Sequence, residues 1–197
     1  MENVVLARHA ESAFSARERA NGDPAVAGGL TERGREQARR LGEELRDDPL
    51  DLCVVTEFRR VVETADLALE GRDVPRLVVP ELNEIAVGAF EGGAIAAYQE
   101  WAWTTGPLDE CPGGGESRAA AALRIARGYR TVLARPERAI LVVAHGVVIR
   151  YVLDAAEGRG PAPRLARVDE ARPYRFSADE LEQALDVLET WCAAPSW

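Results

Sequence analysis

The chain of 197 residues contains no lysine, because all 24 of its basic residues are arginine. The absence of lysine excludes Schiff-base chemistry and the phosphate-binding lysine of a P-loop. Cysteine is also scarce: Cys53, Cys111 and Cys192 are odd in number and show no C-x-x-C spacing, which favours neither a disulfide framework nor a zinc site. We therefore expect a protein of the reducing cytoplasm that needs no metal and no cofactor.

Long apolar runs are missing as well. The first run ends at Arg8 and is too short for a signal peptide, while the longest, 139–153, is interrupted by His145 and Arg150, so no membrane span is expected. The formal net charge of −9 argues against nonspecific nucleic-acid binding, which needs a cationic face. The expected partner is a small phosphorylated substrate bound by local arginines, and the sequence leaves a homodimer open.

Only two histidines are present, and each stands where an apolar run ends. His9 follows the run 4–7 and Arg8, and His145 follows the run 139–144. Such runs are typical of buried strands in a parallel sheet, where ligands bind outside the carboxyl ends of the strands. A single histidine after a strand is more often a paired structural residue. Two of them, each with an arginine nearby, favour a binding site for an anion.

Strand and helix patterns alternate along the chain, which predicts one α/β domain over residues 1–197 with a mainly parallel sheet. Ser177 and Glu180 have the spacing of a capping box, which predicts a last helix with a structural role. The expected strands are 4–7, 52–55, 77–79, 139–144 and a short one near 174–176; the expected helices are 31 to before Pro49, 58–69, 116–134, 146–156 and the helix after Ser177.

Periodicity fades between residues 84 and 115, where glycine and proline mark turns and loops. A connection of this length inside a compact domain is usually functional, so we predict a lid or a substrate-facing excursion. Its aromatic residues Tyr98, Trp101 and Trp103 could line a pocket. Packing of the excursion onto the body is the favoured interpretation, because aromatic side chains bury large areas.

Five short blocks occur in an order that resembles one known family. They resemble the motifs R-H-G-E-S/T, L-T-x-x-G-x-x-Q-A, S/T-x-L-x-R-A-x-Q/E-T-A, L-x-E-x-x-x-G-x-x-E-G and H-G-x-x-x-R of the histidine phosphatase superfamily. The matching segments are 8–12, 30–38, 56–65, 82–92 and 144–150. The resemblance extends from residue 4 to about residue 155. It implies the three-layer α/β/α sandwich of the phosphoglycerate mutase-like fold.

The resemblance also implies roles for three residues in phosphoryl transfer. His9 would attack phosphorus as a neutral imidazole and form a phosphohistidine, and His145 would stabilise the charge that develops on the phosphoryl group. Glu84 would protonate the leaving alcohol and then activate the water that hydrolyses the intermediate. From its chemistry alone, Glu84 is equally well interpreted as a solvated loop acid.

The phosphate itself would be bound by arginine and by hydrogen-bond donors. Guanidinium groups match phosphate oxygens, which makes Arg8 and Arg60 candidate ligands. Gly146 could add its N–H at a helix start, and Ser12 its hydroxyl group.

Two residues depart from the family pattern. Ala10 replaces the usual glycine, which requires ordinary backbone angles there. Ser15 stands where many members have an asparagine that donates to the phosphate, so either Ser15 or Asn21 could bind the phosphate there.

The expected function is that of a metal-independent phosphomonoesterase acting on a small phosphorylated metabolite. Mutases of the family are longer after the Glu84 block and use lysine there, which this chain lacks. A phosphoglycerate mutase-type transfer remains an alternative, as does a phosphoprotein phosphatase, although such members tend to lack the excursion. A third alternative is a non-catalytic phosphate-binding regulatory protein, which would be expected to have lost at least one residue of the catalytic set.

Overall fold

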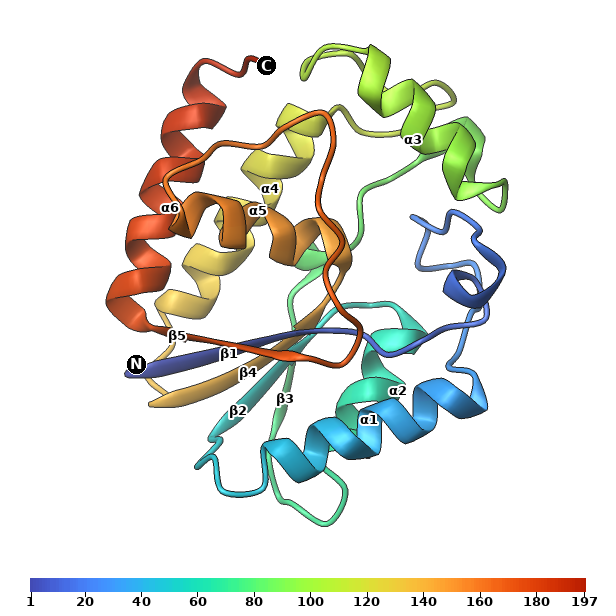
Figure 1. Cartoon of the computed structure of the whole chain (residues 1–197). Helices are drawn as coiled ribbons and strands as arrows, with labels where there is room; N and C mark the ends of the chain where they lie inside the picture. Colours follow the sequence, from blue (N-terminus) through green and yellow to red (C-terminus); the bar gives the residue numbers. More distant parts are fainter.

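A five-stranded sheet organises the molecule, and the computed structural model describes it within residues 1–197. The strands lie in the order β3-β2-β4-β1-β5. Their bounds are β1 (Asn3–Arg8), β2 (Leu52–Val55), β3 (Arg76–Val78), β4 (Ala139–Ala144) and β5 (Pro173–Ser177). Every pairing is parallel except that of β5, which runs antiparallel to β1 at one edge. The predicted mainly parallel sheet is confirmed (Figure 1).

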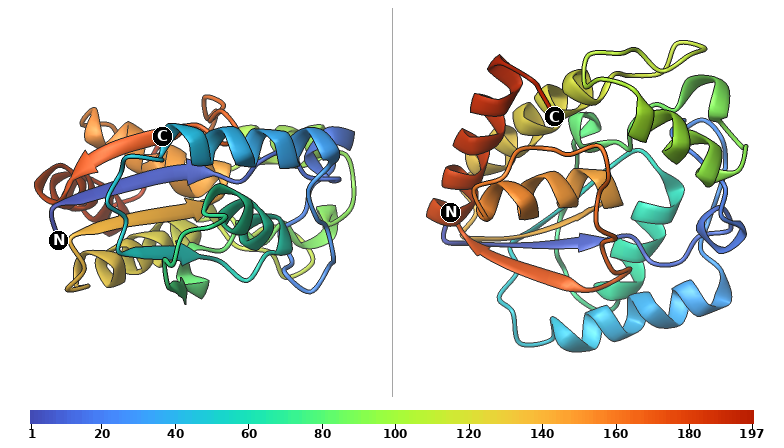
Figure 2. Two further views of the ribbon diagram at one scale, coloured as in Figure 1. Left: turned by 90° about the horizontal axis from the view of Figure 1, so that it is seen from below. Right: turned by 45° about the horizontal axis from the view of Figure 1, so that its top comes forward.

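Helices cover both faces of the sheet, as a three-layer sandwich requires (Figures 1 and 2). One face is covered by α1 (Glu32–Glu44) and α2 (Arg59–Ala68), and the other by α4 (Arg118–Leu133), α5 (Gly146–Ala156) and α6 (Ala178–Ala193). Side chains of the central strand β4 alternate between the two apolar cores: Leu141 and Val143 face α1 and α2, whereas Ile140 and Val142 face the other helices. No helix is both long enough and apolar enough to cross a bilayer.

Helix starts are set by side chains that satisfy free backbone N–H groups. Thr31 accepts from the N–H of Gly34 at the start of α1, and Ser117 accepts from the N–H of Ala120 at the start of α4. The capping box predicted for Ser177 and Glu180 is present at the start of α6.

The parallel topology brings the carboxyl ends of β1, β4 and β2 side by side. His9 follows β1, His145 follows β4 and Thr56 follows β2, so the three residues lie at one edge of the sheet. The prediction that both histidines lie at the same edge is confirmed. The loop of residues 157–172, orange in Figure 1, runs past the end of β1 before β5 begins.

No helix is predicted between residues 84 and 115, but Ile95–Thr104 forms helix α3. The segment before it contains two short 3-10 turns, η2 (Pro80–Leu82) and η3 (Gly88–Phe90). Apolar and aromatic residues lie around most of α3 without forming one clean stripe, so the helical period is weak in the sequence.

The aromatic residues of α3 differ in their surroundings. Tyr98 is buried against the rings of Phe90 and Trp101 and also lines a cavity, so both of the interpretations considered apply to it. Trp103 is 41% exposed, and the guanidinium carbon of Arg164 lies 4.9 Å from its ring centre.

Helix α1 approaches the loop after β1 so closely that only glycine fits at position 34. A Cβ atom at Gly34 would lie 2.0 Å from the carbonyl oxygen of Glu11. We expect Gly34→Ala to lower the free energy of unfolding by about 1–3 kcal/mol in urea titrations, despite the better helix propensity of alanine. The control Glu36→Ala, on the exposed side of α1, should change it by less than about 0.5 kcal/mol. Equal stability of the Gly34 variant and the wild type would contradict the close packing.

Candidate active site

One guanidinium group joins both histidines at the carboxyl edge of the sheet. Arg60, in the first turn of α2, donates from Nε to His9 Nε2 at 3.1 Å. Its Nη2 donates to His145 Nδ1 at 3.2 Å. All three side chains are buried. The arrangement brings together three residues that the sequence places in separate blocks.

His9 is held as a neutral imidazole with a lone pair on Nε2. Its Nδ1 lies 2.8 Å from the carbonyl oxygen of Ala10. Because a carbonyl can only accept, the hydrogen of the neutral ring is on Nδ1. Burial, followed by the positive charges of Arg60 and Arg8, lowers the pKa of His9 well below its usual value. Ala10 has ordinary backbone angles, and its N–H donates to Thr64 Oγ1 at 3.0 Å, so the departure from glycine is accommodated.

His145 is neutral in the opposite tautomer. Arginine only donates, so Nδ1 of His145 accepts from Arg60, and Nε2 carries the hydrogen that faces Thr56 Oγ1 at 3.0 Å. Burial is the largest cause that lowers the pKa of His145, followed by the charge of Arg60. The ring of Phe58 meets the imidazole edge to face, with 4.6 Å between the ring centres.

Asn21 holds the far side of the Arg60 guanidinium. Its side-chain oxygen accepts from Arg60 Nη1, and its backbone oxygen accepts from Nη2 at 3.1 Å. The amide nitrogen of Asn21 donates to Glu91 Oε1 at 2.9 Å, and the N–H of Gly22 donates to Glu91 Oε2 at 2.7 Å. Of the two residues considered for the asparagine role, Asn21 contacts Arg60. Glu91, from the excursion, therefore fixes Arg60 through Asn21.

Ser12 and Ser15 bind each other across one turn of the loop after His9. The N–H of Ser12 donates to Ser15 Oγ at 2.9 Å, and the N–H of Ser15 donates to Ser12 Oγ at 3.1 Å. Both residues border the same cavity as His9. These two hydrogen bonds fix the shape of the loop.

Arg8 and Gly146 face each other beside His9. Arg8 donates from Nη1 to the carbonyl oxygen of Val168 at 2.8 Å, and its Nη2 lies 3.6 Å from Glu170 Oε1. Its Nε is buried without a hydrogen-bond partner and would lie 3.6 Å from a Cβ atom at Gly146. Gly146 opens α5, where N–H groups have no partner within the helix. Both residues border the cavity and supply donors suited to an anion.

Glu84 is a largely buried carboxyl group, with 18% of its side chain exposed. Its Oε2 lies 3.9 Å from His145 Nδ1, and its Oε1 accepts from the N–H of Ile85 at 3.1 Å. Burial raises the pKa of Glu84, although Arg60 and Arg8 act in the opposite direction. The interpretation of Glu84 as a solvated loop acid does not fit this environment.

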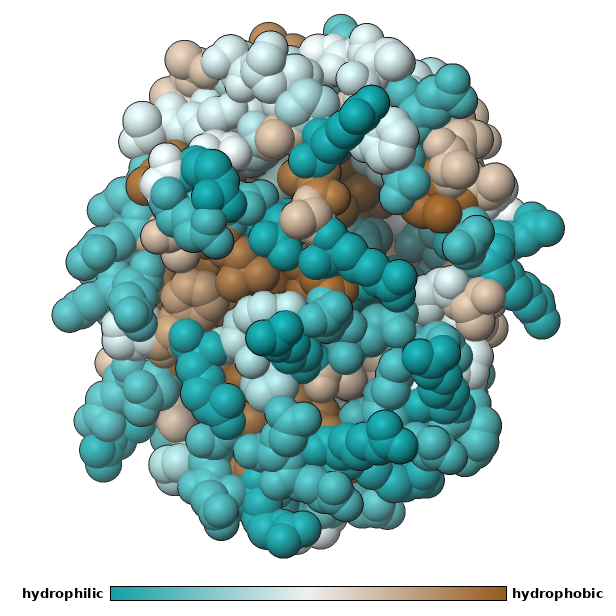
Figure 3. Space-filling view, in the orientation of Figure 1, coloured by the Kyte–Doolittle hydropathy of each residue, from teal (hydrophilic) through white to brown (hydrophobic).

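These residues surround a cavity of about 480 Å³. Seven of the eight expected site residues line it: Arg8, His9, Ser12, Ser15, Arg60, Glu84 and Gly146. His145 is fully buried and contacts the site through Arg60. The rest of the wall is mixed. Apolar side chains come from α3 (Ile95 and Tyr98), from α5 (Val147) and from the loop 157–172 (Leu165), and charged side chains come from Arg19, Arg150 and Arg167. Figure 3 shows hydrophobic and hydrophilic side chains next to one another on one face of the molecule.

Sequence reasoning gave no role to several residues of the site. Three of them lie inside the family motifs: Thr56, Thr64 and Glu91. Their positions in those motifs could have identified them as site residues. Arg167 and Val168 also border the cavity, and no pattern in the sequence indicated that their loop returns to β1.

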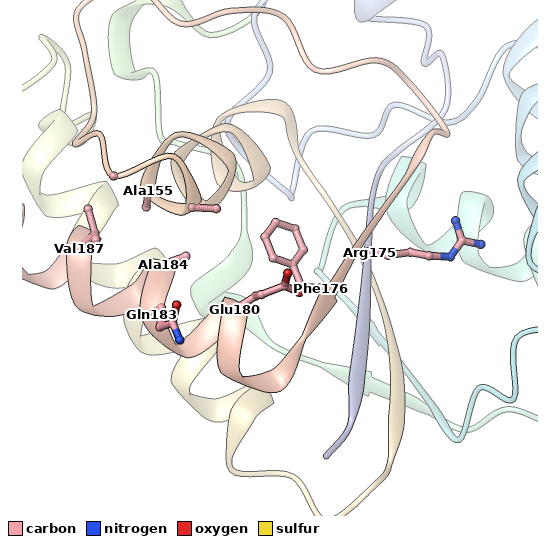
Figure 4. A pocket seen from close by; sticks show the side chains of 9 residues that line it. Ala155, Arg175, Phe176, Glu180, Gln183, Ala184 and Val187 are labelled. Carbon is pink, nitrogen blue, oxygen red and sulfur yellow. The ribbon is translucent and has the colours of Figure 1, made fainter.

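A second hollow, of about 280 Å³, lies between α5, β5 and α6 (Figure 4). It contains Phe176, which pairs with Val4 at the start of β1 and therefore lies at the opposite end of the sheet from the histidines. Its charged residues are Arg175 and Glu180, without a nucleophile beside them. No group of three or more His, Cys, Asp or Glu side chains is placed to hold a metal ion.

Comparisons with known proteins agree with this site. The family model described as histidine phosphatase superfamily (branch 1) matches residues 4–189. The adenosylcobalamin/alpha-ribazole phosphatase of Salmonella typhimurium is 32% identical over 168 residues, covering 81% of this chain and 79% of that protein. A 2,3-bisphosphoglycerate-dependent phosphoglycerate mutase 2 of Gloeobacter violaceus is 34% identical over 166 residues, covering 78% and 74%.

A solved structure gives the same result. The alpha-ribazole phosphatase of Shigella flexneri superposes with a TM-score of 0.74 at 30% identity, covering 88% of this chain and 89% of that one. The two buried histidines, their shared arginine and the family match over almost the whole chain lead to one conclusion: the chain belongs to the histidine phosphatase superfamily.

Proposed function

We propose that this protein is a phosphatase that hydrolyses small phosphate monoesters without a metal ion, through a phosphohistidine on His9. The observation that carries the proposal is the state of His9, a buried neutral imidazole whose Nε2 lone pair borders a cavity rich in anion donors. A neutral imidazole nitrogen is the form that attacks phosphorus.

In the first step, the Nε2 lone pair of His9 forms a bond to phosphorus, and the bond from phosphorus to the alcohol oxygen breaks. Glu84 gives its proton to the departing oxygen, which its raised pKa supports. The phosphate dianion is a stronger acceptor than an imidazole nitrogen, so it takes the donors of Arg60 and leaves the lone pair of His9 free. Arg8 Nε and the N–H of Gly146 bind further oxygens.

In the second step, Glu84 is a carboxylate and takes a proton from water as the water oxygen attacks phosphorus. The bond from phosphorus to His9 Nε2 breaks, and His9 regains its lone pair as inorganic phosphate leaves.

A bound dianion raises the pKa of His145, which then donates from Nδ1 to the phosphoryl oxygens.

The outer part of the cavity supports an organic monoester as substrate. Beyond the donors near His9, its wall contains apolar side chains, among them Ile95, Val147 and Leu165, beside the guanidinium groups of Arg19, Arg150 and Arg167. The apolar part of this wall suits the carbon skeleton of an alcohol, and the arginines suit a further anionic group on the same molecule.

A mutase-type transfer is the second candidate, because the chain is 34% identical to a named phosphoglycerate mutase. Hydrolysis is favoured over transfer because the chain has no lysine, which mutases of the family use after the Glu84 block. The presence of Arg8, His9, Arg60, Glu84 and His145 disfavours a regulatory protein without turnover.

The first test removes the nucleophile. We expect His9→Ala to lower the release of inorganic phosphate from phosphate monoesters by about 10³-fold or more, because no other group replaces the attacking nitrogen. Circular dichroism should show that the variant remains folded. Phosphate release by a folded His9→Ala protein at the wild-type rate would refute the mechanism.

The second test concerns pH. The active form needs neutral His9 and protonated Glu84, so kcat/KM should rise with pH through the lowered pKa of His9, below 6.5, and fall with pH through the raised pKa of Glu84, above 4.5. Glu84→Gln should lower kcat/KM by about 10²–10⁴-fold for alkyl phosphates and abolish the alkaline fall. Glu81→Gln, at a neighbouring exposed acid, should keep the wild-type profile. An alkaline limb that persists in Glu84→Gln would assign that limb to another group.

The third test separates hydrolysis from transfer. Purified protein incubated with 3-phosphoglycerate and with a panel of phosphate monoesters should release inorganic phosphate and form no 2-phosphoglycerate by NMR. The rate should be the same with a strong chelator. Isomerisation faster than phosphate release would establish the mutase alternative, and loss of activity on chelation would establish a metal requirement.

A further inference from the structure

We propose that Arg124 and Glu116 are positioning residues for proton transfer: as an ion pair they hold the backbone on both sides of Glu84 and so aim its carboxyl group into the site. The inference rests on the proposed role of Glu84. Neither residue lines the cavity, so neither is expected to touch the substrate.

Arg124 extends from α4 to the segment that contains Glu84. Its Nη1 donates to the carbonyl oxygens of Glu81 at 2.8 Å and Asn83 at 2.9 Å. Its Nη2 lies 3.4 Å from the carbonyl oxygen of Glu84 itself. One guanidinium therefore contacts three carbonyls of four consecutive residues. The planar fork of arginine suits this task, whereas a lysine ammonium is a single point charge.

Glu116, which lies just before the N-cap of α4, is the second member of the ion pair. It accepts from Arg124 Nε at 2.7 Å through one oxygen and from Nη2 at 2.6 Å through the other. The second oxygen also accepts from the N–H of Ala86 at 2.9 Å. The same ion pair thus binds the chain before Glu84 through carbonyls and after Glu84 through an N–H. About a quarter of each side chain is exposed.

The segment around Glu84 has no helix or strand of its own to fix its direction. Leu82 and Ile85 anchor it by burial. Its other side-chain hydrogen bonds to the body come from Asn83, which donates to Glu57 Oε2 at 2.7 Å and accepts from the N–H of Glu57 at 3.1 Å. Since a displacement of about 1 Å in a reacting group can lower a rate by about 10²-fold, the ion pair is placed to affect the proton transfer.

The experiment compares two substrates that differ in their need for a proton. An alkyl phosphate releases a strongly basic alkoxide that must be protonated, whereas 4-nitrophenyl phosphate releases a stabilised phenolate that leaves unaided. The measured quantity is kcat/KM, which covers the steps up to the release of the alcohol and leaves out the second half-reaction. The variants are Arg124→Met and Glu116→Gln. Arg130→Met is the matched control, an arginine of the same helix that pairs with Asp186 and Glu189 on α6.

We expect Arg124→Met to lower kcat/KM by about tenfold to a hundredfold for the alkyl phosphate and by less than about threefold for 4-nitrophenyl phosphate. Glu116→Gln should show the same selectivity with a smaller loss, and it also serves if Arg124→Met fails to fold. Arg130→Met should keep both values near those of the wild type.

Equal losses on the two substrates, or no loss on either, would overturn the positioning role. Failure of the proposed function itself looks different, because the wild type would then release no phosphate from either ester, or Glu84→Gln would show no selectivity between them.

Discussion

The structure of the site depends on one buried positive charge that is shared by two neutral imidazoles. Arg60 donates to both histidines, and no carboxylate is bonded directly to it. Burial lowers the pKa of Arg60 to about 10, so the group stays charged at neutral pH and depresses the pKa of both neighbours. With Arg8 beside it, the cluster carries positive charge that a phosphate dianion would balance.

The fold places that charge by topology and then fixes it with contacts from distant segments. Adjacent parallel strands bring His9, Thr56 and His145 to one edge, and α2 starts there with Arg60 in its first turn. Residues outside this edge hold the two arginines of the site in place. Glu91 of the excursion holds Asn21 against Arg60. The loop 157–172, which precedes β5, holds Arg8, because the carbonyl oxygen of Val168 accepts from Arg8 Nη1. The excursion is thus part of the site as well as one of its walls.

The parts of this arrangement that could be predicted from sequence are local. Apolar runs of four to six residues marked β1, β2 and β4, and the histidines that follow β1 and β4 marked the site edge. The ordered motifs then identified Arg60 and Glu84. Helix α3 was missed because its apolar residues do not follow one face. The contact of Asn21 with Arg60 and the clamp of Arg124 on the Glu84 segment join residues about 40 positions apart, and no sequence period records such pairs.

The central claim is that phosphate passes through His9, and the scarcity of histidine makes this directly measurable. Wild-type protein would be mixed with a phosphate monoester, stopped in alkali within milliseconds and mapped by mass spectrometry. Phosphohistidine survives alkali, and the chain has only two histidines to distinguish. The account predicts a phosphate on the peptide that contains His9 and none on the peptide that contains His145. Phosphate on His145, or steady turnover without any phosphorylated histidine, would contradict it.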